Sequence, residues 1–422
     1  MDSKSLGTWL SELEQLHPSA IDLGLARCGE VAGRLDLLSP SATTITVAGT
    51  NGKGSTVAVM EALLCEQGVS CGAFTSPHLI NYNERIRVNG TEVDDDVIVR
   101  AFEAIDSARG DISLTYFEFG ALAALWVFRE LGVEYQLLEV GLGGRLDAVN
   151  IIDADVAVVT AIGLDHQEWL GSDVETIAIE KCGIARSGKP CIVADEHAPL
   201  TVLKTLSDLG ATAIKGGSDY RFSDTLFSWC DGQSFPWDVP SGVIPLNAAA
   251  AVAALLSAGL AVDERGFANA MCQLRLRGRR EHIDRGEGDL SIVLDVAHNP
   301  DAAMKLHEFL ATLRKVEKTV AVFAVMADKD CHDMVSRLRN DVDVWCLPKG
   351  IGGERGQAPE KLADYLGESS RVFETFDESL ECALRHLDKG GRLLIFGSFF
   401  TVAEGMAALK PQAFSARVVD DV

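Results

Sequence analysis

Short apolar runs that alternate with helical patterns along nearly the whole chain constrain the fold most strongly. These runs lack the polar alternation of a sheet with one face in water, so we expect helices to cover both faces of each strand. Helical patterns such as Ser55–Gln67 and Pro300–Leu313 lie between them. The pattern predicts an α/β protein of doubly wound type. Its strands are predicted at Thr43–Ala48, Tyr135–Val140, Val156–Thr160, Cys191–Ala194, Ser291–Val296, Thr319–Val325, Val342–Leu347 and Arg392–Phe396.

A polar, glycine-rich stretch divides the chain into two unequal parts. The basic run Arg277–Arg280 leads into Asp284–Gly288 just before a new strand, which places a domain boundary near Arg285. The predicted domains are residues 1–284 and 285–422. The second holds four of the predicted strands and is large enough to fold on its own.

Charge and composition exclude several classes of protein. The chain has 38 basic and 62 acidic residues, a net charge of −24, which repels phosphate backbones and anionic lipid, so neither nucleic acid nor membrane is an expected partner. Glu12 and Glu14 interrupt the apolar pattern of the N-terminus, so it is not a secretion signal. The alanine-rich stretch Ala248–Val262 is too short to span a bilayer. Ten cysteines without a C-x-x-C pair are typical of reduced thiols in the cytoplasm.

The strongest local motif is the segment Gly49–Thr56 (GTNGKGST), which follows a predicted strand and opens a predicted helix. Glycines let backbone N–H groups converge on phosphate oxygens, and the helix N-terminus adds positive potential. Lys53 would reach the β- and γ-phosphates, and Ser55 or Thr56 would ligate magnesium. The spacing differs from the usual G-x4-G-K-[ST], and the alternative is a glycine-rich turn with an incidental lysine.

Polar side chains at other predicted strand ends are candidates for metal or ligand contacts. Glu139 ends an apolar strand, where a carboxylate suits Mg²⁺; the alternative is an ion pair with Arg145. Ser76 follows a strand that ends at Phe74, but a Ser-Pro pair also suits a simple turn. His166 lies in a loop, where a histidine is more often solvated than catalytic.

Lys181 has a local explanation. It lies late in a helix that the pattern starts at Ser172, with Glu175 completing a capping box, so it can complement the helix dipole. The residues alone assign it no function.

In the second part, a strand end again turns into a helix. Asn299 suits an N-cap and Pro300 the first helical position. Asp295 and His298 need another explanation and are candidates for nucleotide contacts. The basic run Arg275–Arg280 is either a solvated face or a phosphate clamp.

Taken together, seven motifs resemble the folylpolyglutamate synthase family of Mur-type ATP-dependent ligases, in particular its bifunctional bacterial branch. The resemblance spans about residues 5–405 and implies a P-loop ATPase domain with a mostly parallel sheet plus a smaller C-terminal Rossmann-like domain. The motifs are GTNGKGS, TSPHL followed by NERIRVNG, LTYFEFG, EVGLGGRLDA, LDH, EKCGIA and DVAHNP.

The resemblance implies a cytoplasmic, monomeric enzyme that joins L-glutamate to a carboxylate with hydrolysis of ATP to ADP and phosphate. The implied acceptors are dihydropteroate, which becomes dihydrofolate, and reduced folates, which become polyglutamates. The carboxylate attacks the γ-phosphate to give an acyl phosphate, which the glutamate amine then attacks. Mg²⁺ at two sites and a carbamylated Lys181 are implied as well.

Roles follow by resemblance. The implied catalytic residues are Lys53, Glu139, His166 and Lys181, and the metal ligands are Ser55, Ser76, Glu139, His166 and Lys181. Contacts to the nucleotide are expected from Thr50, Asn51, Gly52, Lys53, Gly54, Ser55, Thr56, Asn247, Arg279, Asp295, His298 and Asn299. Contacts to the pterin and the other substrates are expected from Gln15, Leu16, His17, Pro18, Thr75, Thr115, Tyr116, Phe117, Glu118, Leu146, Asp147 and Ala148.

Two segments depart from the family pattern. Phe400 stands where the family is associated with histidine. The sequence Arg277-Gly278-Arg279 replaces Pro-Gly-Arg, which leaves Arg279 and Arg280 as alternative nucleotide contacts.

Three other functions fit the sequence less well. A cell-wall Mur ligase carries a substrate domain before the phosphate loop, and only 48 residues precede Gly49 here. A monofunctional folylpolyglutamate synthase is disfavoured by the segments Asp22–Leu25 and Leu114–Glu118. A nucleotide-dependent switch has little use for Glu139, His166 and Lys181 together.

Overall fold

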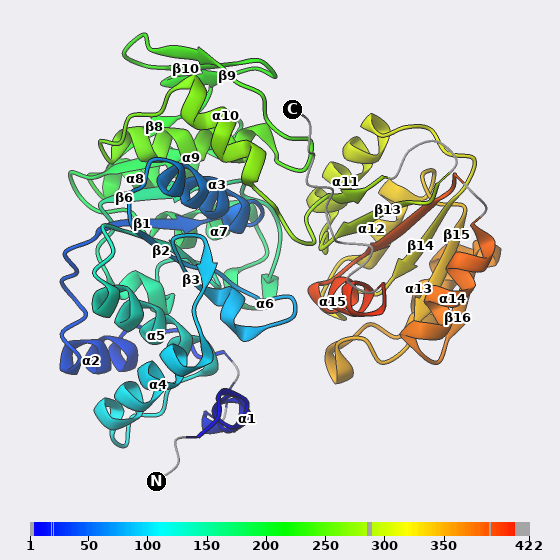
Figure 1. Cartoon of the computed structure of the whole chain (residues 1–422), viewed down its shortest axis with the longest axis horizontal. Coiled ribbons are helices and arrows are strands. Elements are labelled where there is room, and N and C mark those ends of the chain that lie inside the picture. Colours follow the sequence, from blue (N-terminus) through cyan, green and yellow to red (C-terminus); the bar gives the residue numbers. More distant parts are fainter. Residues whose placement is uncertain (1–3, 18, 20, 285–288, 388–389, 410–422) are drawn as a thin grey trace. The chain divides into compact units, whose positions relative to one another are not determined.

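The computed structural model describes residues 4–17, 19, 21–284, 289–387 and 390–409. The chain forms two compact units, Met1–Leu274 and Arg275–Val422, drawn in Figure 1. The division lies ten residues before Arg285, where the sequence suggested a boundary; Arg285 itself lies outside the described residues.

Unit 1 is built on an eight-stranded sheet. Six neighbouring strands, β2-β5-β1-β6-β7-β8, are parallel, while β3 pairs antiparallel with β2, and β4 pairs antiparallel with β3. The carboxyl ends of β1, β2, β5 and β6 therefore meet at one edge, where ligands bind in sheets of this kind. In sheet order the strands are β4 (Thr91–Glu92), β3 (Ile86–Val88), β2 (Cys71–Phe74), β5 (Tyr135–Glu139), β1 (Thr43–Ala48), β6 (Val156–Val159), β7 (Pro190–Val193) and β8 (Thr212–Lys215).

Helices cover both faces of this sheet, and Figure 1 shows α3 and α5 on opposite sides of β1 and β2. The alanine-rich α9 packs against α3, and its small side chains are buried from Asn247 to Leu255. The helices of unit 1 are α1 (Leu6–Leu16), α2 (Ala26–Arg34), α3 (Lys53–Glu66), α4 (Asp95–Arg109), α5 (Tyr116–Leu131), α6 (Gln167–Leu170), α7 (Val174–Cys182), α8 (Leu200–Asp208), α9 (Pro245–Ser257) and α10 (Glu264–Gln273), with 3-10 turns η1 (Tyr82–Arg85) and η2 (Ala148–Ile151).

A small antiparallel sheet, which the sequence did not predict, follows the large one. Its strands are β9 (Tyr220–Phe222), β10 (Leu226–Trp229) and β11 (Ser234–Pro236). Phe227 packs against Trp237 with ring centroids 5.6 Å apart, and Trp237 packs against Phe267 of α10 at 5.3 Å. Aromatic contacts thus join this sheet to α10.

Unit 2 contains a six-stranded sheet in the order β12-β13-β17-β14-β15-β16, in which only the edge strand β12 is antiparallel to its neighbour. Phe323 and Phe396 stack at its centre with ring centroids 4.6 Å apart. The strands are β12 (Glu281–Ile283), β13 (Ser291–Asp295), β14 (Thr319–Phe323), β15 (Val344–Pro348), β16 (Ser370–Phe373) and β17 (Arg392–Phe396). The helices are α11 (Pro300–Thr312), α12 (Cys331–Leu338), α13 (Pro359–Leu366), α14 (Phe376–His386) and α15 (Phe399–Ala408), with 3-10 turns η3 (Gly353–Arg355) and η4 (Gly367–Ser369).

The predicted fold class is confirmed, and all eight predicted strands are present with ends shifted by at most two residues. The strands β12 and β16 of unit 2 come in addition to the four predicted there. The predicted start of the helix before Lys181 is wrong. α7 begins at Val174, because Asp173 rather than Ser172 accepts the capping hydrogen bond from the Thr176 backbone N–H.

No helix within the described ranges is long and apolar enough to cross a membrane. All ten cysteines fall within these ranges, and all are free thiols.

Candidate active site

The loop between β1 and α3 has the backbone geometry that a phosphate site needs. Gly52 precedes the helix with a φ of 94°, in the left-handed region that favours glycine. A side chain at Gly52 would also overlap the buried side chain of Asn247, the third residue of α9. The Asn247 amide nitrogen is buried and has no hydrogen-bond partner among the described residues, so a donor is placed against the loop.

Two lysines meet at this loop. The Nζ atoms of Lys53 and Lys181 each donate to the carbonyl oxygen of Gly49 at 3.0 Å, and Lys53 also donates to the Thr50 carbonyl at 3.2 Å. Lys181 is buried; burial, and then the nearby charge of Lys53, lowers the pKa of Lys181 to about 7. Lys181 lies in the last turn of α7, as the sequence indicated, but its amine is buried against the Gly49 carbonyl.

Thr50 ties the phosphate loop to the turn that carries His166. Its hydroxyl donates to the Gly163 carbonyl and accepts from the Gly163 N–H, both at 3.0 Å. Three residues later, His166 has a φ of 51° and caps α6, while its backbone N–H donates to the Asp165 carboxylate at 2.8 Å. A non-glycine residue held in the left-handed region is uncommon and marks a constrained position.

Glu139 and Ser76 meet at the carboxyl ends of the neighbouring strands β5 and β2. Glu139 is buried, and its Oε2 accepts from the Ser76 backbone N–H at 3.1 Å. Arg145, the alternative partner for Glu139, instead donates to Glu180 at 2.7 and 2.9 Å. The interpretation of Glu139 as an ion-pair partner of Arg145 is therefore wrong.

A buried carboxylate shapes the turn after Glu139. Asp147 accepts backbone hydrogen bonds from Gly141, Leu142 and Val149 at 2.9, 2.9 and 3.0 Å, and it caps η2. Burial raises the pKa of Asp147 to about 6 against these hydrogen bonds. Leu146 and Ala148 flank it, half-buried and buried respectively.

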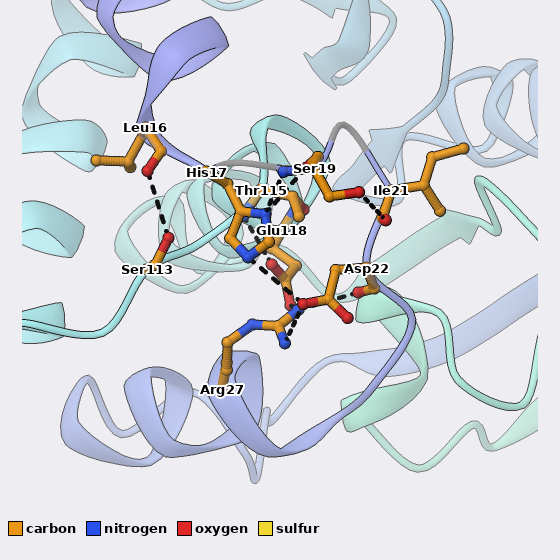
Figure 2. A network of polar contacts seen from close by, with 9 residues as sticks. All are labelled: Leu16, His17, Ser19, Ile21, Asp22, Arg27, Ser113, Thr115 and Glu118. Atoms are coloured by element: carbon orange, nitrogen blue, oxygen red, sulfur yellow. Dashed lines mark hydrogen bonds and ion pairs between the residues drawn. The ribbon is translucent and has the colours of Figure 1, made fainter.

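Three of the residues expected at the pterin pocket, His17, Thr115 and Glu118, are linked by polar contacts at the start of α5. Thr115 and Glu118 form a capping box, in which the Thr115 hydroxyl accepts from the Glu118 N–H at 3.2 Å and Glu118 accepts from the Thr115 N–H at 2.7 Å. Figure 2 shows Arg27 between Glu118 (3.1 Å) and Asp22 (2.7 Å). The sequence did not identify Arg27 as a link in this site.

The N-terminal segment contributes Leu16 and His17 to the polar contacts of Figure 2. The Leu16 carbonyl accepts from the Ser113 hydroxyl at 3.3 Å, and His17 lies 3.4 Å from Asp22. Gln15 is exposed at the end of α1. Pro18 lies outside the described residues.

Aromatic rings lie beside this network. The Tyr116 ring meets Tyr82 edge-on at 5.7 Å, and the Phe117 ring lies 5.6 Å from Phe74. The Arg85 guanidinium lies 5.5 Å from both tyrosine rings and donates to Nδ1 of His78 at 2.8 Å. Burial, and then the Arg85 charge, lowers the pKa of His78 to about 4, so this imidazole is neutral.

In unit 2, the turn between β13 and α11 is closed by internal hydrogen bonds. Asp295 is buried and accepts from the backbone N–H groups of Arg280 and Ala297 at 2.7 and 2.6 Å; burial raises its pKa. Asn299 caps α11 by accepting from the Ala302 N–H at 2.9 Å. This N-cap and the helix start at Pro300 are both confirmed.

The two alternative arginines of unit 2 have different surroundings. The Arg279 guanidinium lies 5.5 Å from the Phe399 ring, which is 6.2 Å from the ring of His298. The Arg280 guanidinium lies over Phe309, and burial lowers its pKa. Arg279 and His298 thus share one aromatic neighbour, whereas Arg280 faces the core.

Among the described residues, no group of three or more His, Cys, Asp and Glu side chains is close enough to hold a metal ion. Mg²⁺ does not require such a cluster, because it takes one or two carboxylates together with hydroxyl, phosphate and water oxygens. The Glu139 carboxylate and the neighbouring Ser76 fit that donor set.

Comparisons with known proteins agree with this geometry. A family model described as "Mur ligase, glutamate ligase domain" matches residues 278–399. The dihydrofolate synthase/folylpolyglutamate synthase of Escherichia coli (strain K12) is 42% identical over 408 residues, which cover 96% of this chain and 95% of the relative. The chain belongs to the dihydrofolate synthase/folylpolyglutamate synthase family. The membership predicted from the seven motifs is confirmed.

Solved structures of the dihydrofolate synthase/folylpolyglutamate synthase family share the fold. E. coli FolC in complex with DHPP and ADP superposes with a TM-score of 0.92 at 41% identity, covering 96% of this chain and 98% of that one. A bifunctional family member with Mn, AMPPNP and L-glutamate bound gives 0.90 at 39% identity, with coverage of 96% and 98%.

Proposed function

We propose that this chain uses ATP to join L-glutamate to dihydropteroate and to reduced folates, with an acyl phosphate as the activated intermediate. The main support is the loop before α3, where Lys53 and Lys181 both donate to the Gly49 carbonyl. The hydrogen-bonded pair Ser76 and Glu139 lies at the ends of the neighbouring strands. The 42% identity to the E. coli enzyme over nearly the whole chain supports the substrates.

Phosphoryl transfer needs positioning and neutralisation of charge more than covalent catalysis. The backbone N–H groups at the start of α3, together with Lys53, suit the β- and γ-phosphates. Ser55, Ser76 and Glu139 would hold a divalent cation, and when bound this ion would neutralise phosphate charge. The relative with Mn and AMPPNP bound supports this assignment.

Lys181 suits carbamylation. Its pKa of about 7 leaves a large share of neutral amine near neutral pH, and a neutral amine adds CO₂ to form a carbamate with release of one proton. The product carries a carboxylate, which with His166 would supply a second metal position. Protein equilibrated with ¹³CO₂ should show a carbamate ¹³C resonance that is absent in Lys181→Met.

The pterin ring is proposed to bind near Tyr116 and Phe117, which lie in the chain between Thr115 and Glu118 of the network in Figure 2. The DHPP complex of E. coli FolC supports a pteroate-like ligand for this family. Contacts from Gln15, Leu16, His17, Thr75, Leu146, Asp147 and Ala148 stay predictions.

For unit 2, nucleotide contacts by Arg279, Asp295, His298 and Asn299 also stay predictions. The position of Arg279 beside the Phe399 ring that also neighbours His298 favours it over Arg280. The monomeric state stays a prediction. Ten free cysteines support a reducing compartment such as the cytoplasm.

Mass spectrometry of two reactions tests the proposal. With ATP, Mg²⁺ and L-glutamate, dihydropteroate should gain one glutamate, and a reduced folate should gain one or more. Extension of the folate alone would refute the bifunctional assignment. If neither product forms, the proposed activity is wrong.

A further inference from the structure

An internal ion pair connects the phosphate-loop helix to the strand beyond Ser76. Glu61 of α3 is buried, and Arg87 of β3 donates to it through Nη2 at 2.7 Å and through Nε at 3.0 and 3.2 Å. The guanidinium therefore meets the carboxylate in a fork, the geometry that makes such pairs strong. α3 begins at Lys53, so this ion pair connects Arg87 to the helix that follows the phosphate loop.

The third nitrogen of the same guanidinium points to the loop that carries Ser76. Nη1 of Arg87 donates to the Thr75 hydroxyl at 3.0 Å and to the Glu84 carbonyl at 2.8 Å. Thr75 directly precedes Ser76, whose N–H donates to Glu139. One planar group thus joins α3, Thr75 and the end of the 76–84 loop.

A lysine could not replace this arrangement. Its single ammonium group is a point charge on a flexible stem, whereas arginine offers five donors in a fixed plane. Spanning Glu61 on one side and Thr75 with Glu84 on the other requires two edges of the guanidinium. The geometry therefore serves orientation as well as charge pairing.

We propose that Arg87, held by Glu61, is a positioning residue that fixes the Thr75–Ser76 step opposite Glu139 and thereby sets the affinity for the divalent cation of the nucleotide complex. The inference rests on the proposed function, because it takes Ser76 and Glu139 as cation ligands. Residues that orient metal ligands typically contribute about 10- to 100-fold in metal affinity.

The test compares Arg87→Lys with a matched control, Arg109→Lys. The side chain of Arg109 is 18% exposed against 19% for Arg87, and it likewise joins a carboxylate (Asp106, 2.6 Å) to a backbone carbonyl (Ile112, 3.2 Å). Mn²⁺ binding is measured by electron paramagnetic resonance with AMPPNP present. Arg87→Lys should weaken binding about 10- to 100-fold, and Arg109→Lys should bind as the unmodified protein does.

Hydrogen exchange provides a readout without metal or activity. The Ser76 amide, which donates to Glu139, should exchange faster in Arg87→Lys than in the unmodified protein or in Arg109→Lys. Wild-type Mn²⁺ affinity and wild-type exchange in Arg87→Lys would overturn the inference. Failure of the unmodified protein to bind Mn²⁺ with AMPPNP would instead refute the proposed function, and the exchange comparison would still decide the role of Arg87.

A double variant, Glu61→Leu with Arg87→Met, separates positioning from stability. Removing one partner leaves a buried charge unpaired, whereas replacing both with apolar side chains often preserves stability. The double variant should therefore fold and still bind Mn²⁺ about 10- to 100-fold more weakly. A folded double variant with wild-type Mn²⁺ affinity would show that the pair only stabilises the fold, and would overturn the inference.

Discussion

Each unit has a turn that leads from a buried strand into a helix. In unit 1 it lies between β1 and α3, and in unit 2 between β13 and α11. In unit 1 the helix follows Gly52, which has no side chain to cap it. In unit 2 the Asn299 side chain caps the helix, and Asp295 accepts the Ala297 N–H. One helix therefore starts without a capping side chain, whereas the other is closed by one.

The difference supports the proposed phosphate site at the start of α3. The first N–H groups of a helix have no partner within the helix, and together with the helix dipole they favour an anion. At α3 no side chain caps the helix, and the side chains of Lys53 and Lys181 lie beside its start. At α11, the Asn299 side chain accepts a hydrogen bond from one of these amides, so a ligand there would contact side chains rather than that N–H group.

Replacing Lys53 with alanine should lower glutamate-dependent phosphate release by about 10³-fold, because one preorganised cationic donor at a developing charge contributes on that scale. Circular dichroism should show an unchanged fold. Lys305→Ala, which removes an exposed lysine paired with Glu308 in unit 2, should leave the rate unchanged. Turnover of Lys53→Ala within a few-fold of the unmodified enzyme would mean that the α3 turn is not the phosphate site.

Glu139→Gln should lower phosphate release by about 10²-fold through loss of a carboxylate for the cation. The chain offers a close control in Glu134, just before the other end of β5, whose carboxylate accepts the Ser70 N–H at 3.0 Å as Glu139 accepts that of Ser76 at 3.1 Å. Glu134→Gln should keep full activity. Equal rates in the two variants would remove Glu139 from the site.

Gly52→Ala should raise the dissociation constant of AMPPNP about 30-fold, or about 2 kcal/mol, because the added Cβ would overlap the Asn247 side chain and displace the loop. Gly68→Ala is the control: Gly68 also has a left-handed φ, 69°, but no atom lies within 4 Å of its added Cβ. Calorimetry should find the nucleotide affinity changed in the first variant only. Parallel changes in both would point to general loss of stability.

Asn299→Ala should lower the free energy of unfolding of unit 2 by about 1 kcal/mol through loss of the N-cap. Asn299→Asp keeps an acceptor oxygen and should retain most of that stability. Urea denaturation monitored in both variants measures the difference. An unchanged midpoint for Asn299→Ala would show that the α11 turn is not closed by this cap.

Local features were predictable from the sequence because their causes are local. Strands such as β6 and β17 contain contiguous apolar runs, and the phosphate loop places its glycines, lysine and hydroxyls within eight residues. The N-cap of α7 shows the limit of such patterns. Ser172 and Asp173 are both good caps, and only the backbone path decides that Asp173 serves.

Contacts between distant segments were not predictable. Glu61 and Arg87 are separated by 26 residues, and Arg145 pairs with Glu180 across 35. From the residues alone, Lys181 has only the local explanation of complementing the helix dipole, because nothing in its neighbourhood along the chain reveals its burial against Gly49. The family resemblance supplied a role for Lys181 that the residues alone did not.

A crystal structure of this chain with AMPPNP and Mn²⁺, with manganese located by its anomalous scattering, would test the central claim most directly. The account predicts the β- and γ-phosphates on the first amides of α3 and on Lys53, with a manganese ion bound by Ser76 and Glu139. Phosphates held instead by the amides of the β13–α11 turn, or manganese away from Glu139, would contradict it.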